Sequence, residues 1–271
     1  MSDKFLNRAD APFSDKVWDM IDQTVIAAAK SQLSGRRLLR TQGPYGLGLK
    51  ALPSGEKTID DKNADDAKMT APCLTPLTMI YSEFTLPTRD IASYQQCCLP
   101  IDLSRAAKSA IDCARQEDNL VFYGSKTIGF KGLMNIDGSC SVKVKTWDNP
   151  GAAADDIIRA VITLDNVGFH GPYALALSAD LYNLLFRLYP QSGQTEIEHI
   201  RQIVTDGIIK TSAIKSGGIL VCSCCPFATI VLGQDLMTGF AGPAGPEYQF
   251  IVSESLAVNI LEPKALCILG K

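Results

Sequence analysis

The first long stretch of the chain has the apolar spacing of an amphipathic helix. Ser14 can cap its start, and Phe13 and Trp18 have the spacing of a hydrophobic staple across that start. Gly35 is expected to end the helix, because glycine accepts the left-handed backbone that often follows a last turn. One face carries apolar side chains four residues apart: Val17, Ile21, Val25, Ala29 and Leu33. This stripe predicts a helix packed through one face.

A polar, irregular stretch runs from residue 43 to residue 76. Gly43-Pro44-Tyr45-Gly46 opens it, Pro53-Ser54-Gly55 interrupts it, and residues 60–66 carry four aspartates. The short apolar flanks favour two extended strands with an exposed polar tip. The aspartates lack the glycine and terminal glutamate of a calcium loop, so no metal site is expected there. An arm of this length cannot bury itself in its own domain and is expected to contact a neighbouring subunit.

The rest of the chain alternates between strand and helix patterns. Residues 77–86 alternate as a strand, with Phe84 and Leu86 on one face and Tyr81 on the other. Residues 102–122 repeat small and apolar side chains at helical spacing, and Gly124 ends this long helix. Residues 239–245 are expected to form a turn. The later predicted helices are 155–166, 179–189 and 196–206, and the later predicted strands are 173–177, 219–224, 229–232, 250–252 and 257–261.

The composition narrows the class of protein. The chain has 271 residues, of which 26 are basic and 29 acidic, so its net charge is near −3. A chain of this length can bury a substantial core, which excludes disorder and a disulfide-stapled miniprotein. The balanced charge argues against broad nucleic-acid binding, because many phosphate contacts require an excess of lysine and arginine. No run approaches the ~18 apolar residues of a membrane span, and no secretory signal is seen, so a cytoplasmic protein without a membrane partner is expected.

Nine cysteines and two histidines are unusual for such a chain. Cys222, Cys224 and Cys225 stand close together, but a zinc site needs about four ligands, and a redox pair of Cys222 and Cys225 should open a helix. Thiols that act as small apolar side chains are the better interpretation. The motifs of hydrolases, phosphate-binding loops and zinc proteases are missing, so no catalytic residue, cofactor or metal is expected.

An ordered set of short segments runs along nearly the whole chain. It comprises Phe5-Leu6, Ala11-Pro12-Phe13-Ser14, Leu33-Ser34-Gly35-Arg36-Arg37, Gly43-Pro44-Tyr45-Gly46, Phe84-Thr85-Leu86, Gln116-Glu117-Asp118, Val121-Phe122-Tyr123-Gly124, Gly129-Phe130-Lys131-Gly132-Leu133, Gly171-Pro172-Tyr173, Leu232-Gly233-Gln234-Asp235-Leu236 and Glu262-Pro263-Lys264-Ala265-Leu266. No single segment is specific, but their order is. Through this set the sequence resembles the family 1 encapsulins, the shell proteins of bacterial nanocompartments, a family that also carries a linocin or bacteriocin-like label.

The resemblance implies an α+β fold of the tailed-phage major-capsid type. Its N-terminal helix and the start of the peripheral domain would occupy residues 1–42, and the extension loop would occupy residues 43–76. The peripheral domain with its spine helix would follow over residues 77–131 and the axial domain over residues 132–234. Residues 235–271 would return to the peripheral domain.

The same resemblance implies a structural role without enzymatic activity. Copies of the chain would close into an icosahedral shell in the cytoplasm, with neither nucleic acid nor membrane as a partner. Besides other copies of itself, the chain would bind a cargo enzyme, which is held inside the shell through its C-terminal targeting peptide. A dye-decolourising peroxidase or a ferritin-like iron-handling protein is the usual cargo of the family, which points to oxidative stress or iron storage.

Site residues are carried over from the family position by position. Ile26, Leu33 and Arg36 match the positions that dock the cargo peptide, through apolar contacts and a charged end. Arg40 stands where relatives tend to carry aspartate, so the docking chemistry is expected to differ. Arg89 stands where flavin-binding members carry tryptophan, so no flavin is expected.

The five-fold pore loop of the family also has a counterpart. It matches four small, uncharged positions: Ser192, Gly193, Gln194 and Thr195. Because no charged ring would line such a pore, the sequence predicts a pore without strong ion selectivity.

Two other functions stay open at this point. A phage major capsid protein shares the fold, but it would hold DNA and undergo a prohead protease step. The balanced charge argues against DNA inside, and the structured N-terminus argues against the protease step. A thiol-dependent enzyme, either a peptidase or a redox protein, would use Cys222 and Cys225.

Overall fold

The computed structural model describes residues 5–59, 69–189, 193–224 and 227–270. The chain divides into two compact units, each assembled from three separate stretches. Unit 1 contains Met1–Ser31, Gln42–Cys113 and Val231–Asn259. Unit 2 contains Gln32–Thr41, Ala114–Ile230 and Ile260–Lys271. The five-segment division expected from the sequence stays a prediction.

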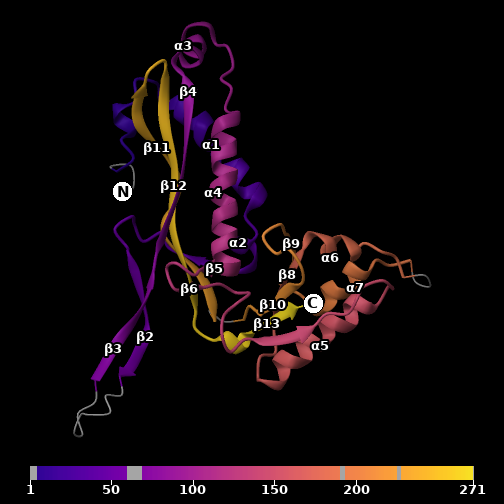
Figure 1. Ribbon diagram of the computed structural model, residues 1–271. Coiled ribbons are helices and arrows are strands. Elements are labelled where there is room, and N and C mark those ends of the chain that lie inside the picture. The colour runs from indigo at the N-terminus through magenta and orange to yellow at the C-terminus, as the bar shows by residue number, and fades with distance from the viewer. Residues whose placement is uncertain (1–4, 60–68, 190–192, 225–226, 271) are drawn as a thin grey trace. The chain divides into compact units, whose positions relative to one another are not determined.

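Unit 1 combines helix α1 (Asp15–Gln32) with long antiparallel strands. β4 (Thr78–Pro87) pairs with β12 (Glu247–Ile260) in continuous register. β11 (Ala228–Ala244) lies beyond β12 in a sheet of order β1-β11-β12-β4, in which β1 is Arg40–Gln42. Figure 1 shows β4, β11 and β12 running side by side. The chain leaves β4 directly into helix α3 (Thr88–Cys97).

Aromatic side chains hold α1 against this sheet. Phe84 of β4 stacks on Phe250 of β12 with ring centroids 5.0 Å apart, and Trp18 of α1 meets Phe250 edge-on at 5.8 Å. Phe13 lies 5.3 Å from Trp18 and 6.0 Å from Phe240 of β11. The contact between Phe13 and Trp18 confirms the predicted hydrophobic staple, and the cluster explains why the first turn of α1 is fixed on the sheet.

The predicted arm is a two-stranded antiparallel hairpin. β2 (Ala51–Ile59) pairs with β3 (Met69–Pro76), and the register is irregular between Pro53 and Glu56. The hairpin extends away from the sheet of unit 1 (Figure 1). Its Leu74 side chain is 61 % exposed, so the hairpin leaves apolar surface in solvent. The predicted polar tip over residues 60–66 lies outside the described residues.

Unit 2 is built on a five-stranded mixed sheet of order β7-β13-β10-β8-β9. β10 (Gly218–Cys222) pairs antiparallel with β8 (Tyr173–Ser178) and with β13 (Leu266–Gly270). Parallel pairs complete the sheet, with β9 (Ile208–Thr211) beside β8 and β7 (Cys140–Lys143) beside β13. The last strand of the chain therefore lies inside this sheet.

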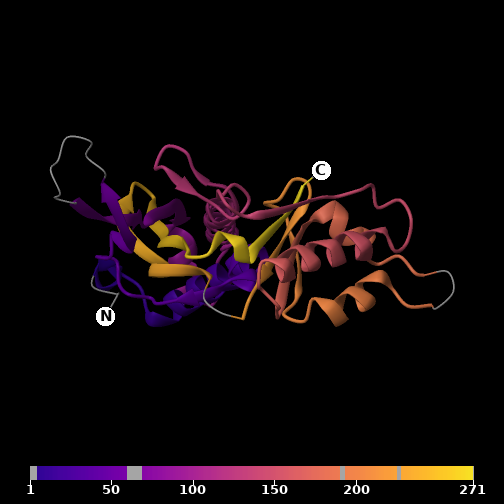
Figure 2. The ribbon, with the colours of Figure 1, turned by 90° about the horizontal axis from the view of Figure 1, so that it is seen from below.

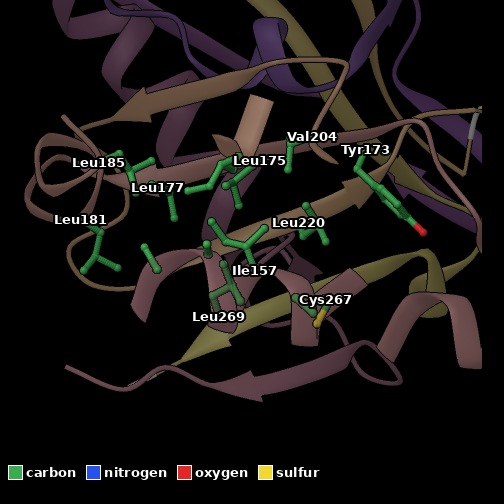
Figure 3. Packing of buried hydrophobic residues seen from close by; sticks show 14 of the residues in the cluster. Ile157, Tyr173, Leu175, Leu177, Leu181, Leu185, Val204, Leu220, Cys267 and Leu269 are labelled. Carbon is green, nitrogen blue, oxygen red and sulfur yellow. The ribbon is translucent and has the colours of Figure 1, made fainter. Parts of the chain in front are cut away.

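Unit 2 includes the helices α5 (Ala152–Asn166), α6 (Ala179–Leu184) and α7 (Glu196–Ile203). Helix α5 contacts β7, β10 and β13, and it lies beside α7 (Figure 2). Figure 3 shows the core beneath α5, in which Ile157 faces Leu220 and Leu269 of the sheet. This apolar face confirms the helix predicted over residues 155–166.

The long helix predicted over residues 102–122 is α4 (Ser104–Tyr123), whose residues through Cys113 belong to unit 1 and the rest to unit 2. Gly124 ends it, as predicted, in the left-handed region at φ +66°. The remaining short elements are η2 (Arg8–Asp10), α2 (Gly35–Leu38), β5 (Gly124–Ser125), β6 (Phe130–Lys131) and η3 (Pro263–Ala265). Within the described ranges, no helix is both long and apolar enough to cross a bilayer.

Two predictions about glycine-rich segments are wrong. Gly35 does not end the first helix, which stops at Gln32, but begins α2. A Cβ atom at Gly35 would lie 3.0 Å from Val121 of α4, so glycine allows the close packing there.

Residues 239–244 are not a turn but the end of β11, and the turn is the Gly245–Pro246 pair between β11 and β12. Hydrogen bonding between these strands overrides the local glycine and proline signal.

Several predicted element boundaries are also wrong. The helix expected over 196–206 stops at Ile203, and the strand expected over 229–232 continues through Ala244 as β11. The helix expected over 179–189 stops at Leu184, and the strand expected over 219–224 stops at Cys222. The strands expected over 250–252 and 257–261 are parts of the single strand β12, because pairing with β4 continues through the polar residues between them. The chain then ends in β13, which the sequence analysis missed.

Candidate functional site

The segment that follows α1 is fixed by an acidic side chain of α4. The Asp118 carboxylate accepts hydrogen bonds from the backbone N–H of Ser34 at 3.0 Å and of Gly35 at 2.8 Å, and from the Ser34 hydroxyl at 2.6 Å. Burial raises the pKa of Asp118 above its ordinary value, while the bonds from Ser34 and Gly35 lower it. Asp118 thus satisfies backbone donors at the start of α2 that have no partner within the helix.

Arg36 is held by the neighbouring residue of α4. Its Nε lies 2.8 Å from Oε1 of Glu117, and its Nη2 lies 2.7 Å from Oε2. The Glu117 side chain is fully buried, whereas Arg36 keeps part of its surface exposed. A two-pronged pair of this kind fixes the guanidinium plane and compensates the buried carboxylate.

A cavity of about 300 Å³ lies beside this segment in unit 2, and its lining includes Arg36, Arg37, Arg40, Asp206 and Cys222. Arg37 donates from Nε to the carbonyl oxygen of Leu33 at 3.0 Å, which turns its side chain back along α2. Arg36 already compensates Glu117, but Arg37 and Arg40 against Asp206 still leave an excess of positive charge at the lining. This excess favours an anionic or carbonyl-rich occupant, because guanidinium groups bind carboxylate and peptide oxygens. The cavity can therefore receive a polar peptide end.

The three residues expected to dock a peptide have different surroundings. Ile26 lies on α1 in unit 1 and is 45 % exposed. Leu33 and Arg36 belong to unit 2, where Leu33 is only 7 % exposed and Arg36 lines the cavity. Ile26 and Arg36 thus have accessible surface, whereas Leu33 supports the backbone at the start of α2.

Two acidic residues organise this site, and neither is among the residues predicted for it from the sequence. Glu117 and Asp118 follow Ala110 and Ala114 along the buried side of α4, where the apolar spacing predicts small or apolar residues. A pair of carboxylates in a buried stripe is a signal for partners elsewhere in the chain, because buried charges are costly without them. That signal was available, but it does not identify the partners.

The expected pore loop is partly described. Ser192 lies outside the described residues, and Gly193 and Gln194 are exposed. Thr195 begins α7 in a capping box with Glu198, whose carboxylate accepts the Thr195 N–H at 2.9 Å. These hydrogen bonds from Thr195 lower the pKa of Glu198. The polar loop is thus anchored at its C-terminal end by helix capping.

The buried Glu196 anchors the same end of the loop to α5. Its Oε1 accepts the backbone N–H of Gly151 at 2.9 Å and of Ala154 at 3.2 Å, at the N-terminus of α5. An acidic side chain is favourable there because it compensates unsatisfied N–H groups and the helix dipole.

The cysteines fall into distinct environments. Cys113 and Cys267 are buried, and burial raises the pKa of each thiol to about 12. Cys222 and Cys224 lie with their Sγ atoms 3.3 Å apart. Among the described residues, no group of three or more histidine, cysteine or acidic side chains is arranged to hold a metal ion. Arg89, the position that the family resemblance compares with a flavin-binding tryptophan, lies on α3.

The chain is similar to proteins of known kind along nearly its whole length. A family model described as "encapsulating protein for peroxidase" matches residues 3–257. The type 1 encapsulin shell protein EncA of Myxococcus xanthus is 33 % identical over 98 % of this chain and 96 % of that protein. A diheme-cytochrome–encapsulin shell fusion protein of Kuenenia stuttgartiensis is 30 % identical over 93 % of this chain and 72 % of that protein.

Solved structures show the same fold. A virus-like particle from Pyrococcus furiosus superposes with a TM-score of 0.74 at 21 % identity and covers 93 % of this chain and 99 % of that one. The capsid of Myoviridae phage XM1 superposes with a TM-score of 0.61 at 11 % identity, over 87 % of this chain and 90 % of that one. The predicted α+β fold of the tailed-phage capsid type is therefore confirmed.

Proposed function

Because the chain belongs to the encapsulin family of shell proteins, we propose that it is a self-assembling subunit of a closed icosahedral shell around a cargo enzyme. The observation that carries this proposal is the family match over residues 3–257, together with a capsid fold over most of the chain. Shell proteins of this family are structural, and we propose that any catalysis belongs to the cargo.

The hairpin of β2 and β3 supports assembly. It leaves apolar side chains such as Met69 and Leu74 exposed, and an exposed two-stranded hairpin is marginally stable alone. Pairing with a neighbouring copy would bury this surface and would couple assembly to folding. A closed shell requires in addition that the rotations between neighbouring copies close on themselves, because contacts that do not close give open filaments.

Electron microscopy of the purified full-length protein tests this proposal. Closed particles of uniform diameter are expected at all but the lowest protein concentrations. A monomer or small oligomer at every concentration would overturn the shell function. DNA inside the particles would instead favour a phage capsid, and empty or protein-filled particles would support an encapsulin shell.

The cargo is proposed to be a dye-decolourising peroxidase or a ferritin-like iron-handling protein, bound through its C-terminal targeting peptide. The matching family is described as encapsulating a peroxidase, and the Kuenenia relative is fused to a diheme cytochrome. Both the family description and the fusion relative therefore support a redox protein as the cargo. We place the compartment in the cytoplasm.

Ile26, Leu33 and Arg36 are proposed to dock that peptide. Ile26 supplies exposed apolar surface, and Arg36 presents a guanidinium to the cavity while Glu117 fixes its plane. Leu33 would act through the backbone at the start of α2, because its side chain is almost completely buried. Apolar anchors with one charged contact are the usual composition of a peptide interface hot spot.

Co-purification with the cargo tests the dock. Ile26→Ala, Leu33→Ala and Arg36→Ala are each expected to lower the amount of cargo in the particles without preventing their assembly. Ile162→Ala is a matched control, since Ile162 is an exposed isoleucine on α5 that the dock does not use. Cargo loading that is unchanged in all three dock variants would reject these residues, and the shell function would stand.

A further inference from the structure

Two cysteines at the end of β10 come closer together than strand geometry provides. Cys222 is the last residue of β10, and Cys224 follows two positions later. Side chains two residues apart on an extended strand are separated by about 6.6 Å along it. The Sγ atoms of Cys222 and Cys224 are nevertheless only 3.3 Å apart. The extended backbone of β10 ends at Cys222, and the change of direction at Ser223 turns the two thiols toward each other.

The residue between the two thiols is held by Pro172, which directly precedes the neighbouring strand β8. The Ser223 N–H and hydroxyl both donate to the carbonyl oxygen of Pro172, at 2.9 Å and 3.1 Å. Cys222 pairs with Tyr173 of β8, and the Tyr173 hydroxyl donates to Asp165 at 2.7 Å. The sheet thus fixes the backbone on which both thiols stand, so their contact belongs to the folded state.

The two thiols differ in access to solvent. The Cys222 side chain lines the cavity of about 300 Å³ near Arg36, but the residue is only 1 % exposed. Cys224 is exposed. A small oxidant therefore reaches Cys224 first, and Cys222 is already within contact distance to complete a bond.

We propose that Cys222 and Cys224 form a peroxide-reactive dithiol that closes to a reversible intramolecular disulfide. In the first step the sulfur of Cys224 attacks one oxygen of a hydroperoxide, the O–O bond breaks, and Cys224 becomes a sulfenic acid as water or an alcohol leaves. In the second step the Cys222 sulfur attacks the Cys224 sulfur, the S–O bond breaks, and water leaves. The peroxide is reduced by two electrons and the two thiols are oxidised by two.

A disulfide suits this pair better than a bound metal ion. Zinc sites use about four ligands, and the described residues offer no group of three suitable side chains. Disulfide formation by a peroxide brings the two sulfur atoms from 3.3 Å to about 2.05 Å, a short movement that requires no third ligand. The pair also differs from Cys113 and Cys267, whose thiols are buried and have a pKa raised to about 12, because one of its two thiols is exposed.

Mass spectrometry of the full-length protein tests the proposal. Cleavage after Lys215 and Lys264 releases a peptide that contains Cys222, Cys224 and Cys225, so Cys225→Ser leaves only the proposed pair in it. The reduced Cys225→Ser protein is treated with one equivalent of hydrogen peroxide per chain, and remaining thiols are then alkylated. The peptide is expected to be two hydrogen atoms lighter and unalkylated, and a dithiol reductant is expected to restore both alkylation sites.

Single variants separate the two roles. Cys222→Ser is expected to stop at the sulfenic acid of Cys224, which dimedone traps, whereas Cys224→Ser is expected to leave Cys222 reduced. Cys97→Ser is a control that removes an exposed thiol elsewhere in the chain. In this variant Cys222 and Cys224 should form the disulfide as in the wild type. The proposal is overturned if both thiols stay alkylatable at peroxide doses that oxidise Cys97, if the bond requires Cys225, or if the purified protein holds a stoichiometric metal ion on the pair.

Discussion

Glu117 and Arg36 form a two-pronged ion pair in which the carboxylate is completely buried and the guanidinium reaches the surface of a cavity. The pair links the middle of α4 to the short helix after α1. The residue proposed to bind a peptide is therefore also needed to compensate a buried charge, and the two roles make different predictions.

Arg36→Ala should destabilise the protein, because it leaves the Glu117 carboxylate buried without its partner. Removing one member of a buried pair costs about 3 kcal/mol or more, which corresponds to a Tm roughly 6–12 °C lower in a chain of this size. Adding Glu117→Gln to this variant should recover much of the loss, since the uncompensated charge is gone. Thermal unfolding of assembled particles measures both effects, and an equal Tm for Arg36→Ala and the wild type would contradict the role of the pair.

The same comparison isolates the docking role. The double variant with Arg36→Ala and Glu117→Gln should fold but still load less cargo, because the guanidinium is missing. Full cargo loading in this double variant would assign Arg36 a purely structural role.

Asp118 should make stability depend on pH in an unusual direction. Burial raises the pKa of its carboxyl in the folded state, so the folded chain binds the proton more tightly than the unfolded chain. The contribution of this protonation to the free energy of unfolding is therefore fully present below the ordinary aspartate pKa of about 4. It is lost as the pH rises through the folded-state pKa. Asp118→Asn removes the titrating carboxyl group and therefore this pH dependence.

The measurement is the difference in Tm between the wild type and Asp118→Asn over a series of pH values. This difference should shift against the wild type as the pH rises from about 4. A wild type that instead gains stability over Asp118→Asn along the same series would show that hydrogen bonds from Ser34 and Gly35 outweigh burial.

Gly124 is predicted to resist substitution. It ends α4 at φ +66°, and a Cβ atom there would collide with the carbonyl oxygen of Phe130 in the paired strand β6. Gly124→Ala should cost more than the about 1–2 kcal/mol of a left-handed alanine, because β5 and β6 must also separate. Gly168→Ala keeps a positive φ of 93° in open space, and Gly48→Ala has neither problem. Melting temperatures that fall in the order Gly48→Ala, Gly168→Ala, Gly124→Ala would confirm this reasoning; equal values for the last two would refute the collision.

Local patterns predicted the elements whose signals lie within a few residues. The stripe on α1, the staple of Phe13 and Trp18, and the glycine at the end of α4 are all such signals, and the structure confirms them. Strand pairing depends on residues that are distant in the sequence, so a local pattern does not reveal it. β13 is a five-residue strand whose place between β7 and β10 depends on residues far away in the chain, so its own sequence gave no boundary.

The candidate site shows the same division. Arg36 was predicted as a docking residue through the family resemblance, but its partner Glu117 lies 81 positions away. The contact of Cys222 with Cys224 was hidden for another reason. Alternation along an extended strand would put both side chains on one face but about 6.6 Å apart, and only the departure from the strand at Ser223 brings the sulfur atoms to 3.3 Å.

The exposed hairpin gives the most direct prediction about assembly. Leu74 of β3 is 61 % exposed, although leucine on a hairpin gains stability when it is buried. Leu74→Asp should leave the rest of unit 1 folded, because its sheet and its aromatic cluster do not use this side chain, but it should weaken the contact with a neighbouring copy. Mass photometry should then show a larger fraction of free subunits than in the wild type at equal concentration. Leu74→Met, which preserves the apolar surface, is the matched control and should assemble normally; complete particles formed equally well by Leu74→Asp would mean that this side of the hairpin is not an assembly contact.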